Sequence, residues 1–162
     1  MAEVIKVGMA DLKVCKAPDS LTTIGLGSCV GIALYDPVMK VAGLAHVMLP
    51  DSTQIKNNSV IAKFADTGIK KLYDDMISAG ASKFRMVAKI AGGAKMFELK
   101  SAATSSINIG DRNVEASKAM LKQLGIRIIA EDTGLNYGRT VVLDGETGDY
   151  IIRAVGKDEK TI

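Results

Sequence analysis

The sequence is poor in the residues that build metal sites and disulfide frameworks. Its 162 residues include one histidine, two cysteines and no tryptophan. These counts exclude a zinc site that needs several imidazoles, a four-cysteine cluster and a framework of several disulfides. We therefore expect no metal site, and Cys15, Cys29 and His46 each need their own explanation.

Aromatic residues, runs of like charge and long apolar stretches are also scarce. Aromatic residues make up 4% of the chain, and its 21 basic and 18 acidic residues are mixed along it, which argues against nucleic-acid binding. No apolar run approaches the ~18 residues of a membrane span, and the start of the chain lacks the features of a signal peptide. We expect a cytoplasmic protein without membrane insertion, whose cysteines are free thiols. The sequence leaves open a disulfide between Cys15 and Cys29.

The residues that are present suffice for one hydrophobic core. With 48% hydrophobic and 24% charged residues, the chain resembles an ordinary globular domain. We predict a single domain over residues 1–155, followed by a charged flexible tail over residues 156–162.

Periodicity predicts both strands and helices. Apolar residues at spacings of three and four predict one helix from caps at Asn58 and Ser59 to Gly80, and a second from about Asp111 to Gly125. Alternating and β-branched patterns predict strands over residues 4–7, 13–16, 30–35, 41–48, 84–91, 126–130, 139–143 and 150–155. Hairpins at both ends argue against a purely doubly wound fold. The predicted class is α/β (α+β), with a layered mixed β-sheet packed by two main helices.

The segment 22–31 combines three glycines with one thiol, that of Cys29. Glycines allow a backbone turn whose N–H groups point outward, and such groups stabilise the oxyanion that forms when a nucleophile attacks a carbonyl. A cysteine with its ordinary pKa of ~8.5 needs a base to become a thiolate at neutral pH. His46 is the only imidazole. Cys29 and His46 are therefore a candidate nucleophile and base.

Whether these two side chains meet depends on the register of a hairpin. A turn centred between Pro37 and Val38 sets Cys29 directly opposite His46 on one face of the sheet. A turn centred on Val38 sets Cys29 opposite Val47 and moves His46 to the other face. A third group should orient the ring of the base, and Thr22, Thr23 and Asp132 are the polar candidates.

Other interpretations of these residues need no chemistry. Cys29 and Cys15 would be ordinary buried hydrophobic residues of strands, and His46 a core histidine. Gly92 and Gly93 would be a corner of close packing as readily as part of a substrate loop. A thiol redox protein is disfavoured because Cys15 and Cys29 do not form a Cys-x-x-Cys pair.

Five blocks stand out along nearly the whole chain: residues 23–29 (TIGLGSC), 45–52 (AHVMLPDS), 89–94 (KIAGGA), 108–115 (NIGDRNVE) and 130–134 (AEDTG). Together they resemble the CheD family of chemoreceptor glutamine deamidases. One position departs from the family pattern, because Leu135 follows Thr133-Gly134 where a second glycine is familiar.

The resemblance implies a chemotaxis enzyme that hydrolyses glutamine side chains of methyl-accepting receptors to glutamate and releases ammonia. It implies a catalytic triad of Cys29, His46 and Thr23, no cofactor, and a fold similar to that of glutamine-deamidating toxins. It also implies binding to CheC, a phosphatase, on the surface that would meet receptors. The alternative is a module that mainly binds and regulates CheC, with the active site as a docking surface.

The remaining candidates belong to the surroundings of the thiol. Gly27, Ser28, Gly92 and Gly93 are candidates for substrate binding and for the oxyanion donors. An apolar pair in a loop of small residues, Met96–Phe97, is the candidate contact for receptor helices and for CheC.

Overall fold

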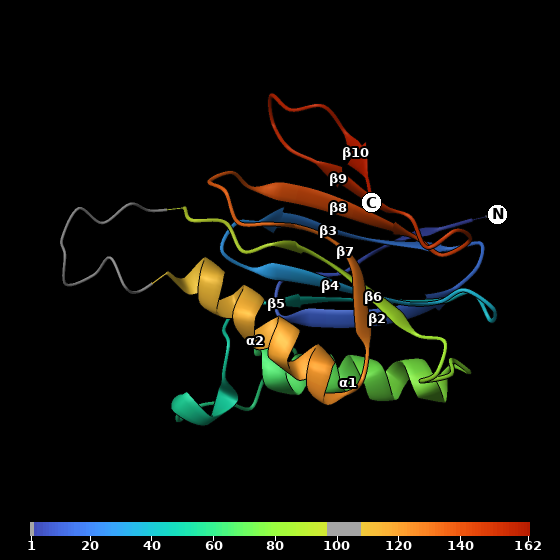
Figure 1. Cartoon of the computed structure of the whole chain (residues 1–162), viewed down its shortest axis with the longest axis horizontal. Coiled ribbons are helices and arrows are strands. Elements are labelled where there is room, and N and C mark those ends of the chain that lie inside the picture. The colour runs from blue at the N-terminus through green and yellow to red at the C-terminus, as the bar shows by residue number, and fades with distance from the viewer. Residues whose placement is uncertain (1, 97–107) are drawn as a thin grey trace.

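The computed structural model describes residues 2–96 and 108–162. Within them, two five-stranded sheets and two helices form three layers (Figure 1). The outer sheet has strand order β1-β3-β8-β9-β10 and the central sheet β2-β5-β4-β6-β7, and both helices cover the free face of the central sheet. The strands are β1 (Val4–Lys6), β2 (Asp11–Lys16), β3 (Ser20–Leu26), β4 (Val30–Asp36), β5 (Val41–Val47), β6 (Val87–Gly92), β7 (Arg127–Thr133), β8 (Arg139–Asp144), β9 (Tyr150–Arg153) and β10 (Lys160–Thr161); the helices are α1 (Ala65–Ser78) and α2 (Ile109–Gln123), with short 3-10 turns at Ser52–Gln54 and Ile61–Lys63.

The predicted class and the two main helices are confirmed, but the strands divide between two sheets. The central sheet is therefore covered on both faces, and every residue of β4 and β5 is buried. Because alternate side chains of a strand point to opposite faces, Val30, Ile32 and Leu34 pack with the helices, whereas Ala33 and Tyr35 pack against the outer sheet. The face between the two sheets is the one that carries the candidate site.

The glycines of segment 22–31 had indicated a turn, but much of this segment lies in strands. Its first half, residues 22–26, belongs to β3, which pairs in parallel with β1 and antiparallel with β8. The register with β8 shifts between Thr23 and Leu26, and Gly25 has a positive φ of 78° within this irregularity. Only residues 27–29 form the connection to β4. The irregularity at Gly25 accounts for the one glycine of this segment that lies inside β3, whereas Gly27 lies in the connection and Gly31 in β4.

The hairpin of β4 and β5 adopts neither predicted register. Its four-residue turn, 37–40, follows Asp36, whose Oδ1 accepts hydrogen bonds from the N–H groups of Val38 and Met39. Gly31 consequently pairs with His46. Cys29 precedes β4 and packs against the buried cluster between the two sheets, on the side of the central sheet where Thr23 of β3 meets His46. The predicted direct pairing of Cys29 with His46 was therefore wrong, although both residues lie on the side of the central sheet that faces the outer sheet.

Helix α1 begins at Ala65, later than the caps predicted at Asn58 and Ser59. Its first turn is held by Asp66, whose carboxylate accepts from the N–H of Ser52 at 3.1 Å and from its hydroxyl at 2.7 Å. Helix α2 has Asn108 as its N-cap, with the side chain accepting from the Asp111 N–H. Neither helix, nor any other in the described part of the chain, could cross a membrane.

The two C-terminal hairpin strands pair as predicted, with Leu143 opposite Tyr150. The strand predicted over residues 84–91 begins only at Val87, and Phe84 is exposed in a turn. Residues 156–162, predicted as a flexible tail, end in β10, which pairs with β9. Main-chain hydrogen bonds in both directions between Ile162 and Tyr150 attach this end to the outer sheet, which is why it is ordered.

Candidate active site

Cys29 lies in the short connection between β3 of the outer sheet and β4 of the central sheet. Its carbonyl oxygen accepts from the N–H of Gly93 at 2.8 Å, and the carbonyl of Gly27 accepts from the N–H of Ala94 at 2.8 Å. The thiol is free and partly exposed. The chain end of β6 therefore holds the backbone around the thiol, while the side chain keeps access to solvent.

The other cysteine has no such setting. Cys15 is buried in β2, and burial, with a smaller contribution from Asp19, raises the pKa of its thiol to about 11. Both cysteines are free, so the disulfide that the sequence left open is not formed. Cys15 is a core residue with a thiol that stays protonated at neutral pH.

His46 is held by Thr23 across the gap between the two sheets. The Thr23 Oγ1 lies 2.7 Å from the His46 Nδ1, and both residues are fully buried. The same hydroxyl donates its proton to the carbonyl oxygen of Val7 at 2.8 Å. A hydroxyl has only one proton, so it accepts from the ring, and Nδ1 carries the hydrogen. The other ring nitrogen, Nε2, is then the unprotonated one.

The Nε2 atom of His46 is free to act as a proton acceptor. It is buried and has no hydrogen-bond partner among the described residues. Burial lowers the pKa of His46 below its ordinary value, so the ring is neutral at pH 7. Burial raises the pKa of the Cys29 thiol, a shift opposed by its own backbone N–H. A neutral imidazole thus lies on the same face of the sheet as a thiol that needs a base.

The other two candidates for the orienting group are occupied elsewhere. The hydroxyl of Thr22 donates to the carbonyl of Val141 at 2.8 Å. The carboxylate of Asp132 is 3.1 Å from the Arg139 Nε and 3.1 Å from the Lys160 Nζ. Of the three, only Thr23 contacts the ring.

Gly92 and Gly93 are placed for close packing. Both have positive φ, 106° and 65°, and a Cβ atom at Gly92 would overlap the carbonyl oxygen of Cys29. The N–H of Gly93 is used by that same carbonyl. These glycines therefore support the backbone of Cys29, which is the alternative that the sequence had left open.

The backbone N–H groups close to the thiol in sequence differ in whether they already donate a hydrogen bond. The N–H of Gly27 donates to the carbonyl of Gly25 at 3.1 Å. Among the described residues, the N–H groups of Ser28 and Cys29 donate to no other residue's carbonyl. These two N–H groups are the candidates for oxyanion donors.

Met96 borders the site, whereas Phe97 lies outside the described residues. The Met96 side chain is 45% exposed, and its Cγ would lie 3.2 Å from a Cβ atom at Gly27. The absence of a side chain at Gly27 lets Met96 lie over the loop that carries Cys29. Lys95 and Leu135 are next to it, joined by a hydrogen bond from the Lys95 N–H to the Leu135 carbonyl.

Comparison with known proteins shows the family to which the chain belongs. Residues 48–154 match the family model described as CheD chemotactic sensory transduction. The chain belongs to the CheD family. A relative from Lachnoclostridium phytofermentans, named "Probable chemoreceptor glutamine deamidase CheD", is 59% identical over 100% of both chains. One from Caldanaerobacter subterraneus subsp. tengcongensis, with the same name, is 54% identical over 99% of both.

The similarity to solved structures is weaker. The Neisseria meningitidis protein NMB0706 matches with a TM-score of 0.49 and 11% identity, over 91% of this CheD chain and 72% of that chain. The likeness to glutamine-deamidating toxins that the sequence implied stays a prediction.

One further buried residue of this CheD chain escaped the sequence analysis. Asn113 of α2 is fully buried, and its side-chain amide contacts the carbonyls of Ser28 and Met48. The sequence analysis predicted this helix but gave Asn113 no role. Its only signal was its position within the block 108–115.

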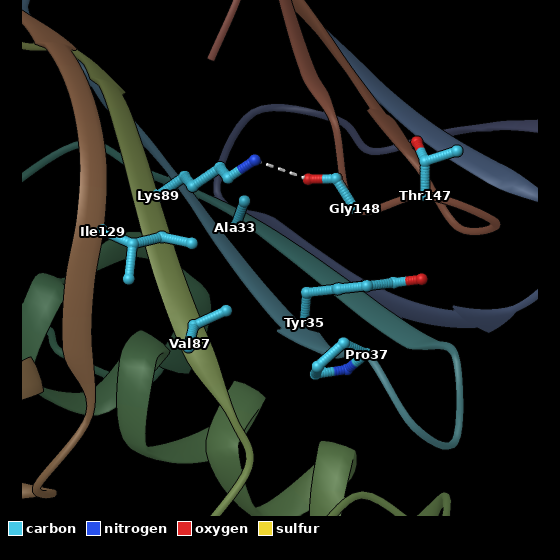
Figure 2. Close-up of a pocket in the computed structure, with 8 residues that line it drawn as sticks. All are labelled: Ala33, Tyr35, Pro37, Val87, Lys89, Ile129, Thr147 and Gly148. Carbon is cyan, nitrogen blue, oxygen red and sulfur yellow. Dashed lines mark hydrogen bonds between the residues drawn. The ribbon is translucent and has the colours of Figure 1, made fainter.

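A cavity of about 230 Å³ lies away from these residues, toward the far end of β4 (Figure 2). Its wall includes Tyr35, Val87 and Ile129, and Lys89 donates from its rim to the carbonyls of Gly148 at 2.9 Å and Ile162 at 2.7 Å. It contains neither the thiol nor the imidazole. The candidate active site is therefore the thiol and imidazole at the edge between the sheets.

Proposed function

We propose that this CheD-family protein hydrolyses the side-chain amide of glutamines on chemoreceptors, producing glutamate and ammonia. The observation that carries the proposal is the contact between Thr23 and His46, because it leaves an unprotonated Nε2 on the face where Cys29 lies. The names of the relatives supply the substrate class. The enzyme would act on the cytoplasmic part of the receptors and would use no cofactor.

Acylation begins with a proton transfer within the pair. The His46 Nε2 takes the proton of the Cys29 thiol, and the thiolate attacks the carboxamide carbon of glutamine. The carbonyl oxygen gains a negative charge, which the N–H groups of Ser28 and Cys29 stabilise. His46 then returns the proton to the amide nitrogen, ammonia departs, and a thioester remains on Cys29.

Deacylation uses the same groups with water as the nucleophile. His46 removes a proton from water, which attacks the thioester carbon. The bond to sulfur then breaks as glutamate forms, and His46 returns the proton to the sulfur of Cys29. Thr23 keeps the ring in the tautomer that both steps need. It also offers the imidazolium an oxygen acceptor at Nδ1.

Receptor signalling regions are helical, so we propose that a helix face docks over the loop that carries the thiol. The exposed and apolar Met96, which borders Gly27, supports this position for the docking surface. We place Phe97 on the same surface as a prediction. The resemblance to the CheD family adds CheC as a second protein that binds there, in competition with receptors.

Mass spectrometry of a receptor cytoplasmic fragment tests the activity. The wild-type protein should convert selected glutamines to glutamate, Cys29→Ala should convert none, and Cys15→Ala, a matched control, should retain conversion. Conversion by Cys29→Ala at the wild-type rate would refute the role of Cys29. A wild-type protein that converts no receptor glutamine would refute the function.

The alternative role as a CheC-binding module is tested with the same variant. If the two roles share only a surface, Cys29→Ala should still bind CheC and change its phosphatase activity although it no longer deamidates. Loss of CheC binding in Cys29→Ala, with the fold intact, would contradict separate roles for the chemistry and the docking.

A further inference from the structure

The side chain of Asn113 joins the segment that carries the candidate nucleophile to the segment that follows the candidate base. Its Nδ2 donates to the carbonyl of Ser28 at 2.9 Å and to the carbonyl of Met48 at 2.9 Å. Ser28 directly precedes Cys29, and Met48 follows His46 by two residues. In the register of β4 and β5 the last pair is Val30 with Val47, so Asn113 bridges the strands where their ladder ends.

The orientation of this amide follows from its neighbours. Both contacts are carbonyl oxygens, which only accept hydrogen bonds, so the NH₂ group must face them. The opposite end, Oδ1, is buried without a hydrogen-bond partner among the described residues. An unsatisfied buried acceptor of this kind is destabilising, and in native proteins it calls for an explanation beyond packing.

Helix α2 is pressed closely against the same region. A Cβ atom at Gly110 would lie 2.5 Å from the carbonyl oxygens of Gly93 and Ala94, so the glycine permits the first turn of α2 to touch the segment that follows β6. The N–H of Gly93 in turn donates to the carbonyl of Cys29. The residues around the thiol are therefore held from α2 by two routes, through Gly93 and through Asn113.

The contact with Ser28 determines where the N–H of Cys29 points. The Ser28 carbonyl and the Cys29 N–H belong to one planar trans peptide unit, in which the two bonds point in opposite directions. A carbonyl held toward Asn113 directs this N–H away from α2. The hydrogen bond also polarises the peptide unit and so strengthens the N–H as a donor.

We propose that Asn113 is a positioning residue that aims the Cys29 N–H at the oxyanion formed during acyl transfer. The proposal rests on the proposed function, because it assumes that Cys29 attacks a carbonyl carbon. On this proposal α2, which lies on the opposite side of the central sheet, helps to stabilise the oxyanion that forms between the two sheets. Asn113 itself touches no reacting atom.

Two reactions of the Cys29 thiol separate this role from a merely structural one. Acylation by p-nitrophenyl acetate forms a bond from sulfur to the acetyl carbon through a tetrahedral oxyanion, then releases p-nitrophenolate. Alkylation by iodoacetamide displaces iodide from a CH₂ group and forms no oxyanion. In both reactions His46 removes the proton of the thiol. Peptide mass mapping distinguishes modification of Cys29 from modification of Cys15.

The full-length protein with Asn113→Ala should lose roughly 10- to 100-fold in the rate of acylation, less than the roughly 100- to 1000-fold of a removed oxyanion donor, because the Cys29 N–H is misaligned and not lost. Its rate of alkylation should change by less than about 3-fold, because no oxyanion forms. Ser117→Ala is the matched control, since Ser117 is a buried polar residue of the same helix whose hydroxyl bonds the Asn113 carbonyl. It should leave both rates within about 2-fold.

The rates of acylation and alkylation in Asn113→Ala decide whether Asn113 is a positioning residue. An equal fall of both rates in Asn113→Ala, or no fall in acylation, would overturn the proposal. If Asn113→Ala does not fold, Asn113→Ser keeps one donor and should show the same split with a smaller loss. Both reactions proceed without a receptor, so a wild-type protein that shows the split but leaves receptor glutamines intact would refute the proposed function and not the role of Asn113.

Discussion

The Thr23 hydroxyl lies 2.7 Å from the His46 Nδ1 and so connects the outer sheet to the central sheet. The same hydroxyl donates to the Val7 carbonyl, at the point where β1 ends. This arrangement fixes the tautomer of the only histidine, and among residues 2–96 and 108–162 no negatively charged group bonds to the ring. The base therefore stays weak and neutral, which suits a proton transfer from a thiol at neutral pH.

Replacing Thr23 tests the value of this contact. Thr23→Val keeps the shape of the side chain but leaves the Nδ1 hydrogen buried without an acceptor, so kcat for deamidation should fall by roughly 10- to 100-fold. Thr23→Ser keeps the hydroxyl and should retain most of the activity. The ¹⁵N NMR spectrum of the one histidine should show a protonated Nδ1 in the wild type. Equal activity of the valine and serine variants would contradict the role of Thr23.

The pH dependence of activity follows from the burial of His46. Because burial lowers the pKa of His46, the acid limb of kcat/KM should lie below pH 6.5, and NMR titration of the ring should give the same midpoint. The unfolded chain binds a proton at this residue near pH 6.5 while the folded protein does not, so stability falls as the pH drops from there toward the folded pKa. A ring that titrates above pH 6.5 would contradict this account.

The packing of Gly92 against Cys29 predicts a large effect on stability. In Gly92→Ala the new methyl group would overlap the Cys29 carbonyl at a positive φ, so the free energy of unfolding should fall by roughly 3 kcal/mol. Gly25→Ala is the matched control: φ is also positive, 78°, but a Cβ atom there meets nothing within 4 Å. It should cost about 1 kcal/mol. Urea denaturation compares the two, and equal losses would show that the contact with Cys29 matters little.

Asp36 should stabilise the turn between β4 and β5. Burial alone would raise the pKa of Asp36, but hydrogen bonds from the Arg85 side chain and from the N–H groups of Ser82, Met39 and Val38 outweigh it and lower the pKa to about 2. Asp36→Asn should reduce the free energy of unfolding by roughly 3 kcal/mol at pH 7. The difference is fully present above about pH 4 and is lost as the pH falls toward 2.

The control for this change is an exposed ion pair. Asp74 pairs with Lys70 four residues earlier on the surface of α1, and Asp74→Asn should cost less than about 0.5 kcal/mol. Thermal unfolding across pH measures both variants. An Asp36→Asn effect as small as that of Asp74→Asn, or one that is independent of pH, would contradict the stabilising role.

The sequence singled out Cys29 and His46 as candidates because both are rare residue types in settings that suit the proposed chemistry. It could not choose among Thr22, Thr23 and Asp132, since that choice depends on which strand of a second sheet lies over the imidazole. The second sheet was not predicted, because Gly25 and Gly27 were interpreted as a turn and no strand was predicted where β3 lies. Asn113 was missed because a buried asparagine on a helix leaves no periodic signal, and its partners are carbonyls that no sequence pattern marks.

The central claim is that a receptor glutamine becomes covalently attached to Cys29, and hydroxylamine tests it most directly. Hydroxylamine attacks a thioester in place of water and converts it to a hydroxamate. With wild-type protein, mass spectrometry of a receptor fragment should find hydroxamate in place of part of the glutamate at the same positions, and neither product with Cys29→Ala. Glutamate formed at an unchanged rate, with no hydroxamate at any hydroxylamine concentration, would contradict a thioester on Cys29.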